Sequence, residues 1–261
     1  MKKNIQLIIV AVMALVCTTI SSCKKDKTET PIPENTTGTI AFHLHTNADT
    51  AEVEHYDSVY QMGDGRKITV TKAQLYISNI QLVKLDGSTL NVAGVIKLKK
   101  QEEEVYSIGS VPAGNYKSVK FDVGLNAATN AAVPAASDST LNQPSMWFDM
   151  MAQPSGFVFV NFQGTVDTTI AANGTVGQMQ PFSYKIGTNA NLKNVTLPDQ
   201  NYTVSPNQVH YIHITVDYGM LFMGIQLNVN SNLNMNTVSD NASAHGTQLA
   251  DNISMMFSYE M

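Results

Sequence analysis

Histidine is the residue type in this chain that is best suited to binding a metal ion. His43 and His45 lie two residues apart in an alternating segment, so on a strand both side chains point to one face, with Cβ atoms about 7 Å apart. Two imidazoles at that spacing can converge on one ion, and imidazole nitrogen suits copper, zinc and nickel. Both lie opposite the apolar triplet Ile40, Phe42 and Leu44. They are therefore either metal ligands or solvated side chains on an outward face.

Four further histidines differ in what they could contribute. His210 and His213 are three residues apart, so one strand would place them on opposite faces, which makes them a poor pair. His213 could supply a third ligand if its strand lies beside that of the first pair. His245, after an Asn-rich stretch, is the other candidate third ligand. His55 lies among acidic residues, which is typical of a solvated loop.

A second cluster combines methionine with the single tryptophan of the chain, and comprises Met146, Trp147, Met150 and Met151. Thioethers are soft ligands for Cu(I). Met beside Trp more often fills a core, however, and we favour that interpretation. Trp147 follows a long polar loop, at the kind of junction where binding sites often lie. It is therefore a candidate for an oxidised or site-adjacent aromatic residue.

Other kinds of chemistry have little support in the sequence. It contains no Gly-rich phosphate loop, no serine nucleophile elbow and no paired-cysteine metal motif, so we predict that the protein is not an enzyme. The formal net charge of −5 argues against a nucleic-acid binder. Two cysteines are too few for a disulfide scaffold.

The N-terminus has the pattern of a targeting segment. A charged start precedes the apolar run 5–16, which is too short to span a membrane. Residues 20–23, Ile-Ser-Ser-Cys, resemble a bacterial lipobox, which predicts a signal peptide over 1–22 and a lipidated Cys23. The alternative is a plain secretory signal with an unrelated cysteine. Residues 23–36 read as a flexible tether. We expect an outer-membrane lipoprotein of the cell envelope, on the periplasmic side, anchored by acyl chains.

The remainder, residues 37–261, is predicted to be one all-β domain, a β-sandwich. Apolar and polar residues alternate with period two, and turn signals recur between the alternating segments. Residues 157–160 are apolar at every position, which indicates a central strand. The alternation changes phase at Ser78 and Asn79, which predicts a β-bulge. Residues 126–143 and 228–244 read as long loops.

The order of these segments is similar to that of the MbnP-like copper-binding domain family of periplasmic proteins and lipoproteins. The resemblance extends over most of residues 38–259. Its segments are 40–45, 68–80, 112–125, 146–148, 156–164, 212–217, His245 and 250–253.

This resemblance implies a β-sandwich that binds copper rather than an enzyme. Family members use histidine ligands with a tryptophan oxidised to kynurenine by a dihaem peroxidase-like partner. A first-strand histidine corresponds to His43 or His45, but the neighbours here are Phe42 and a second histidine. The family's second ligand histidine lies in the loop that corresponds to 126–143, which contains none. A copper site in this chain must therefore be built differently.

Two functions follow from these observations. The first is a lipid-anchored periplasmic copper-binding protein for acquisition, storage or delivery, with His43 and His45 as ligands and His213 or His245 as the third. The second is a cell-envelope binding module for a protein or glycan that keeps the fold without the copper site. Retention of metal by the purified protein would distinguish them.

Overall fold

The computed structural model describes residues 36–92, 94–149 and 156–260. The predicted signal peptide, Cys23 and nearly all of the predicted tether lie outside the described residues. No helix within the described ranges is long and apolar enough to cross a membrane.

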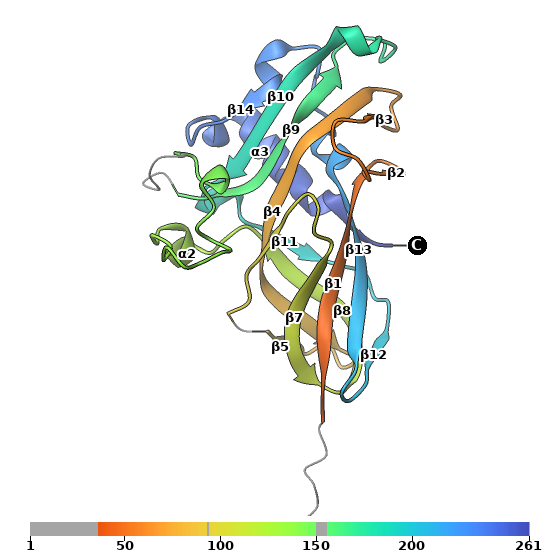
Figure 1. Cartoon of the computed structure of the whole chain (residues 1–261), viewed down its shortest axis with the longest axis vertical. Coiled ribbons are helices and arrows are strands. Elements are labelled where there is room, and N and C mark those ends of the chain that lie inside the picture. The colour runs from red at the N-terminus through yellow and green to blue at the C-terminus, as the bar shows by residue number, and fades with distance from the viewer. Residues whose placement is uncertain (1–35, 93, 150–155, 261) are drawn as a thin grey trace, which may run out of the picture. The chain divides into compact units, whose positions relative to one another are not determined.

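The smaller of two sheets, sheet A, is built around the first strand of the domain. Strand β1 pairs in parallel with β13 and antiparallel with β2 and β7, while β15 pairs antiparallel with β13. Figure 1 shows β1 and β13 running side by side. The strands of sheet A are β1 (Thr37–Ala48), β2 (Ala51–Glu52), β7 (Val105–Pro112), β13 (Val209–Asp217) and β15 (Phe257–Tyr259).

The larger sheet, sheet B, has the order β11-β8-β4-β9-β10-β14, with β12 beside β8 and three short strands beside β4. Its strands are β3 (Val59–Gln61), β4 (Lys67–Lys84), β5 (Thr89–Asn91), β6 (Lys97–Lys99), β8 (Gly114–Val123), β9 (Val158–Asp167), β10 (Met179–Gly187), β11 (Lys193–Thr196), β12 (Tyr202–Val204) and β14 (Asn234–Met235).

Helices are short and lie in the connections. Within the described residues, the α-helices are α2 (Ala127–Asn130) and α3 (Ala244–Asn252). The 3-10 turns are η1 (Pro144–Met146), η2 (Val176–Gln178), η3 (Asn189–Asn191), η4 (Tyr218–Phe222), η5 (Asn230–Leu233), η6 (Asp240–Ala242) and η7 (Ile253–Met256).

The two sheets enclose a continuous apolar core, and the prediction of an all-β sandwich is confirmed. Phe42 of β1 lies against Phe121 of β8, with ring centroids 5.9 Å apart. Both side chains are buried, as are Ile40 and Leu44 on the same face of β1. Alternation along β1 therefore directs its apolar residues inward and His43 outward, as the sequence predicted.

The predicted bulge in β4 is confirmed. Pairing between β4 and β8 shifts register between Ser78 and Gln81. Asn79 adopts a left-handed φ of 48°, which asparagine tolerates better than most residues. The inserted residue returns Ile80 to the same buried side as Ile77, which accounts for the change of phase.

Strand β9 is central, as predicted, and has an apolar core on each face. It pairs with β4 on one edge and β10 on the other. Val160 contributes to the core between the sheets, whereas Phe159 contributes to a second cluster on the other face of sheet B. Met146 is fully buried in this second cluster, which confirms the core-filling interpretation for that residue. Met150 and Met151 lie outside the described residues.

Both predicted loops are held by side-chain hydrogen bonds to the backbone. In 126–143, the Asp138 carboxylate accepts from the amides of Thr140 and Leu141. In 228–244, buried Asn241 accepts from the amide of Gly187 and donates to backbone carbonyls. Neither segment is a loop throughout: the first contains α2, and the second contains η5, β14 and η6 and runs into α3.

Strand β6 contributes a buried cation. Lys99 is 0% exposed, and its Nζ donates to the carbonyl of Lys100 at 3.3 Å. Burial lowers the pKa of Lys99 to about 8, although nearby Glu104 and Glu103 oppose the shift. In the unfolded chain, lysine keeps its proton up to about pH 10.4. Below pH 8 the folded chain must therefore bury a charged ammonium group, which lowers the free energy of unfolding. This loss of stability disappears as the pH rises toward 10.

We therefore expect Lys99→Met to raise the free energy of unfolding at pH 7 by up to about 3 kcal/mol, with a gain that shrinks toward pH 10. Urea unfolding at several pH values measures it. The matched control is Lys100→Met, at the exposed neighbouring position. A difference between wild type and Lys99→Met that stays constant from pH 7 to pH 10 would refute the assignment.

Candidate metal site

Three imidazoles meet on the outer face of sheet A. His43 of β1 and His213 of β13 are direct partners in the parallel register. Their Nδ1 atoms are 3.1 Å apart. His45 lies two residues further along β1, and its ring centroid is 4.1 Å from that of His43. Each of the three offers one ring nitrogen within 4.8 Å of the others.

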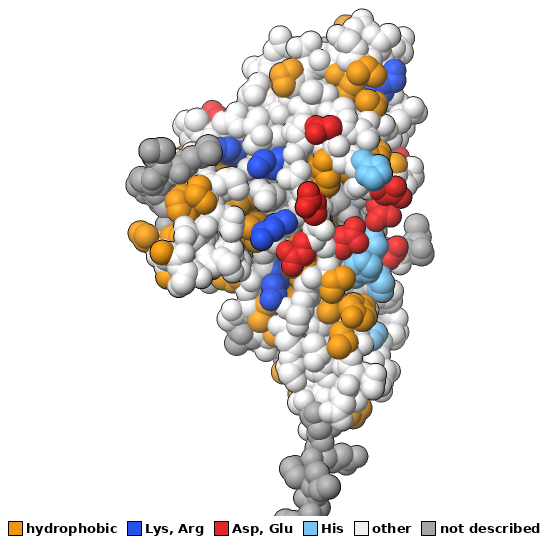
Figure 2. All heavy atoms as spheres, viewed as in Figure 1, with side chains coloured by type: hydrophobic (Ala, Val, Ile, Leu, Met, Phe, Trp, Pro, Cys, Tyr) orange, Lys and Arg blue, Asp and Glu red, His pale blue; other side chains and the backbone are white. Residues whose placement is uncertain are grey.

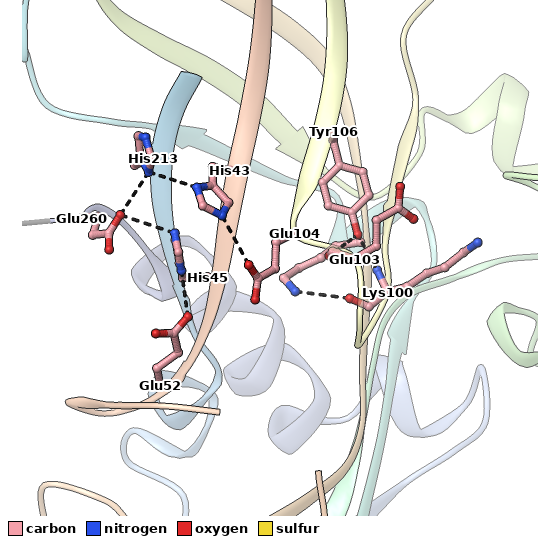
Figure 3. Close-up of polar contacts among 10 residues, drawn as sticks. His43, His45, Glu52, Lys100, Glu103, Glu104, Tyr106, His213 and Glu260 are labelled. Carbon is pink, nitrogen blue, oxygen red and sulfur yellow. Dashed lines mark hydrogen bonds and ion pairs between the residues drawn. The ribbon is translucent and has the colours of Figure 1, made fainter. Parts of the chain in front are cut away.

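Three glutamates from different segments contact these imidazoles (Figure 3). Glu104 lies 3.3 Å from Nε2 of His43, and Glu52 lies 2.8 Å from Nδ1 of His45. Glu260 lies 3.2 Å from Nδ1 of His213 and 3.4 Å from Nε2 of His45. Figure 2 shows histidine side chains on this surface with acidic side chains gathered beside them.

Neighbouring strands bring each glutamate to the cluster. The carbonyl of Glu104, just before β7, accepts from the amide of Leu44 in β1. The turn after β1 is closed by Asp49, with a left-handed φ of 59°, and places Glu52 opposite Asn47. Glu260 follows β15, and its amide donates to the carbonyl of His213. The acidic residues are therefore fixed by backbone pairing.

The geometry of the nitrogens fits a metal ion. Two nitrogens bound to one ion at about 2.0–2.1 Å with a tetrahedral angle lie about 3.3 Å apart, close to the observed Nδ1–Nδ1 spacing of 3.1 Å. Nε2 of His45 is shielded from solvent and makes no hydrogen bond within the described part of the chain. The polar contact of this nitrogen is the ion pair with Glu260 at 3.4 Å, so an ion bound there would have both the imidazole and that carboxylate beside it. His45 also groups with Glu52 and Glu104, so carboxylate oxygen can complete the donor set.

The other histidines lie apart from this cluster. His210 faces the opposite side of β13 from His213, as predicted, and stacks on Tyr202 with centroids 4.9 Å apart. Burial lowers the pKa of His210, and the proximity of His213 adds to the effect. His55 is exposed, in agreement with the solvated-loop interpretation.

His245 is in α3 rather than beside the first pair. Its ring centroid is 6.1 Å from that of Tyr184, in β10 of sheet B. Burial lowers the pKa of His245. Of the two candidate third ligands, the geometry therefore favours His213.

Trp147 lies on the second apolar cluster, against the outer face of sheet B. Its indole Nε1 donates to the carbonyl of Leu141, and its backbone bridges to Phe157. The histidines lie on the outer face of sheet A. The structure thus does not bring Trp147 to the histidine cluster, and the expectation of a site-adjacent aromatic residue is not met. Its oxidation stays a prediction.

The three glutamates were not identified by sequence reasoning. Glu52 read as part of a solvated acidic loop, and Glu104 ends a run of three glutamates before a strand. The acidic run could have indicated carboxylates near the metal site only if the pairing of β1 with β7 had been known. That pairing is set by the sheet topology and cannot be read from the sequence of either strand.

Comparison with known proteins identifies the family. A family model described as MbnP matches residues 37–240. The chain belongs to the MbnP family. The resemblance inferred from the ordered segments is thereby confirmed.

Among solved structures, MbnP from Methylosinus trichosporium is similar to this MbnP-family chain. The two share 17% sequence identity with a TM-score of 0.49, over 72% of this chain and 78% of that chain. Among curated proteins, no sequence matches.

Proposed function

We propose that this MbnP-family chain is a lipid-anchored periplasmic protein that binds copper for acquisition, storage or delivery. The single observation that supports the proposal most strongly is the convergence of His43, His45 and His213 on the outer face of sheet A. Three imidazoles with carboxylates beside them form a donor set of the kind that holds divalent copper or zinc.

Copper is favoured over other metals for two reasons. The affinity of a given nitrogen and oxygen site for divalent first-row metals is highest for copper. The resemblance to the MbnP-like copper-binding domain family also implies copper. Metal coordination accounts for the imidazoles and carboxylates of this face, so binding rather than catalysis is the proposed role.

The glutamates have a defined part in this proposal. Glu52 accepts from His45 Nδ1 if that nitrogen carries the proton, which leaves the Nε2 lone pair of His45, beside Glu260, for the ion. The negative charge of the three carboxylates also attracts a cation to this face. About half of each glutamate side chain is exposed to solvent, so the charge is accessible to an approaching ion.

The proposal also includes a lipid anchor and an oxidising partner protein. The lipobox at residues 20–23 supports acylation of Cys23 and retention at the periplasmic side of the outer membrane. A dihaem peroxidase-like partner, which the family resemblance implies, would act on Trp147 if it acts on this chain. An intact mass at the Trp147 peptide tests for that oxidation.

The experiment that tests copper binding is elemental analysis of the full-length chain isolated from cells grown with added copper. We expect about one copper per chain at the histidine cluster. A triple change of His43, His45 and His213 to alanine should remove it. His55→Ala is the matched control, since His55 is exposed and is not one of the three grouped histidines. Wild-type protein that retains no copper and takes up none on titration would overturn the proposal in favour of a non-metal binding module.

A further inference from the structure

A pocket of about 350 Å³ lies at the end of the β1 and β13 pair. Asp217, the last residue of β13, contributes to its wall, four residues beyond His213. At about 3.3 Å per residue, the two positions are about 13 Å apart along the strand. His45 pairs with Thr215, about 7 Å from Asp217 along the strand, but the lining of the pocket includes none of the three histidines or their glutamates.

Three methionines line this pocket, Met62, Met220 and Met223. Met62 is buried, at 6% exposure, whereas Met223 is 49% exposed. Core filling accounts for Met62 but not for a methionine left half in solvent. Methionine has three rotatable bonds and a polarizable sulfur, so methionines that line one pocket can adjust to a ligand that they share.

The loops that carry these methionines are fixed. The carbonyl of Met62 accepts from the amide of Gly65, and the amide of Met62 donates to the carbonyl of Arg66. On the other wall, Asn252 is 1% exposed and its Nδ2 donates to the carbonyls of Leu221 and Met223. Both walls are thus held by hydrogen bonds.

The pocket has an excess of negative charge. Arg66 is paired with Asp64 at 3.0 Å, which leaves the carboxylates of Asp49 and Asp217. Asp217 accepts from the amides of Asp49 and Gly219, and burial raises its pKa. A side chain at Gly219 would come within 2.9 Å of Asp217 Oδ1, the oxygen that accepts from both amides, so glycine gives this contact room. A cation in the pocket would be stabilised by this charge.

We propose that this pocket is a second metal site, which binds a soft monovalent cation, Cu(I), through the thioethers of Met62, Met220 and Met223. Thioether sulfur selects Cu(I), whereas imidazole and carboxylate suit Cu(II). The two sites would then hold the two oxidation states of one cargo. The choice of copper as cargo rests on the proposed function; the existence of the thioether site does not.

The test uses the full-length chain with His43, His45 and His213 changed to alanine, so that the first site does not compete. Ag(I), a redox-inert substitute for Cu(I), is titrated against a competing chelator, and Cu(I) is added under anaerobic conditions for X-ray absorption. We expect one equivalent of Ag(I), sulfur ligation of Cu(I), and an affinity lowered at least about tenfold by changing the three methionines to leucine.

Two further variants keep the result interpretable. Met223→Leu alone changes a half-exposed side chain, so a weaker Ag(I) affinity in that variant cannot arise from unfolding. Met235→Leu is the matched control, because Met235 is buried in β14 and does not line the pocket. It should leave Ag(I) binding unchanged.

Unchanged Ag(I) affinity in the methionine variants, or no Ag(I) binding in the triple-alanine histidine variant, would overturn the inference. Either result leaves Cu(II) binding by the histidine cluster intact. Conversely, a wild-type chain that binds Ag(I) through its methionines but no Cu(II) would support the thioether site and overturn the histidine cluster as the copper site.

Discussion

Replacing His213 with alanine is expected to lower the affinity of the full-length chain for Cu(II) by more than about 100-fold. Loss of an outer-shell partner of a metal ligand already costs about 10–100-fold, and His213 supplies one of three converging imidazoles. His43→Ala should have a similar effect, because the two Nδ1 atoms are 3.1 Å apart. Competition titration against a Cu(II) chelator measures both.

Two controls accompany this prediction. His55→Ala changes an exposed histidine that is not one of the three grouped imidazoles and should leave the affinity unchanged. His245→Ala should also leave it unchanged, since His245 lies beside Tyr184 in sheet B. If His245→Ala weakened Cu(II) binding and His213→Ala did not, the assignment of the third ligand would be wrong.

The largest loss of stability is expected from Phe162→Ala. Phe162 is fully buried in the central strand β9, with ring centroids 4.9 Å from Phe182, 4.7 Å from Tyr218 and 5.8 Å from Phe222. Removing the ring loses its transfer free energy and leaves a cavity among three aromatic neighbours. We expect the free energy of unfolding to fall by about 3–5 kcal/mol.

Urea unfolding measures this loss. Phe162→Leu retains part of the volume and should cost less, while Val133→Ala, at an 85% exposed position, should stay within about 0.5 kcal/mol of wild type. A Phe162→Ala protein as stable as the Val133→Ala control would contradict the central place of Phe162 in the core.

Local features of the fold could be predicted because they depend on nearby residues. The outward direction of His43 follows from the alternation in β1, and the bulge at Asn79 follows from the phase change in β4. The central position of β9 follows from its apolar residues on both faces. Helix α3 was not predicted, although Ser243 caps it by accepting from the amide of Gly246.

The complete site could not be predicted, because it depends on pairing between distant segments. His43 and His213 are 170 residues apart in sequence, and only the parallel register of β1 with β13 makes them neighbours. Glu104 and Glu260 reach the cluster through pairing of β7 and β15 with those strands. Alternation defines the face of a strand but not which strands lie beside it.

The central claim is that His43, His45 and His213 bind one copper ion together. Pulsed electron paramagnetic resonance of the Cu(II)-loaded full-length chain tests it most directly, because coupling to the remote imidazole nitrogens counts the coordinated histidines. The account predicts three imidazoles in the wild type and two after His213→Ala. A count of one or none in the wild type, or the same count in both proteins, would contradict it.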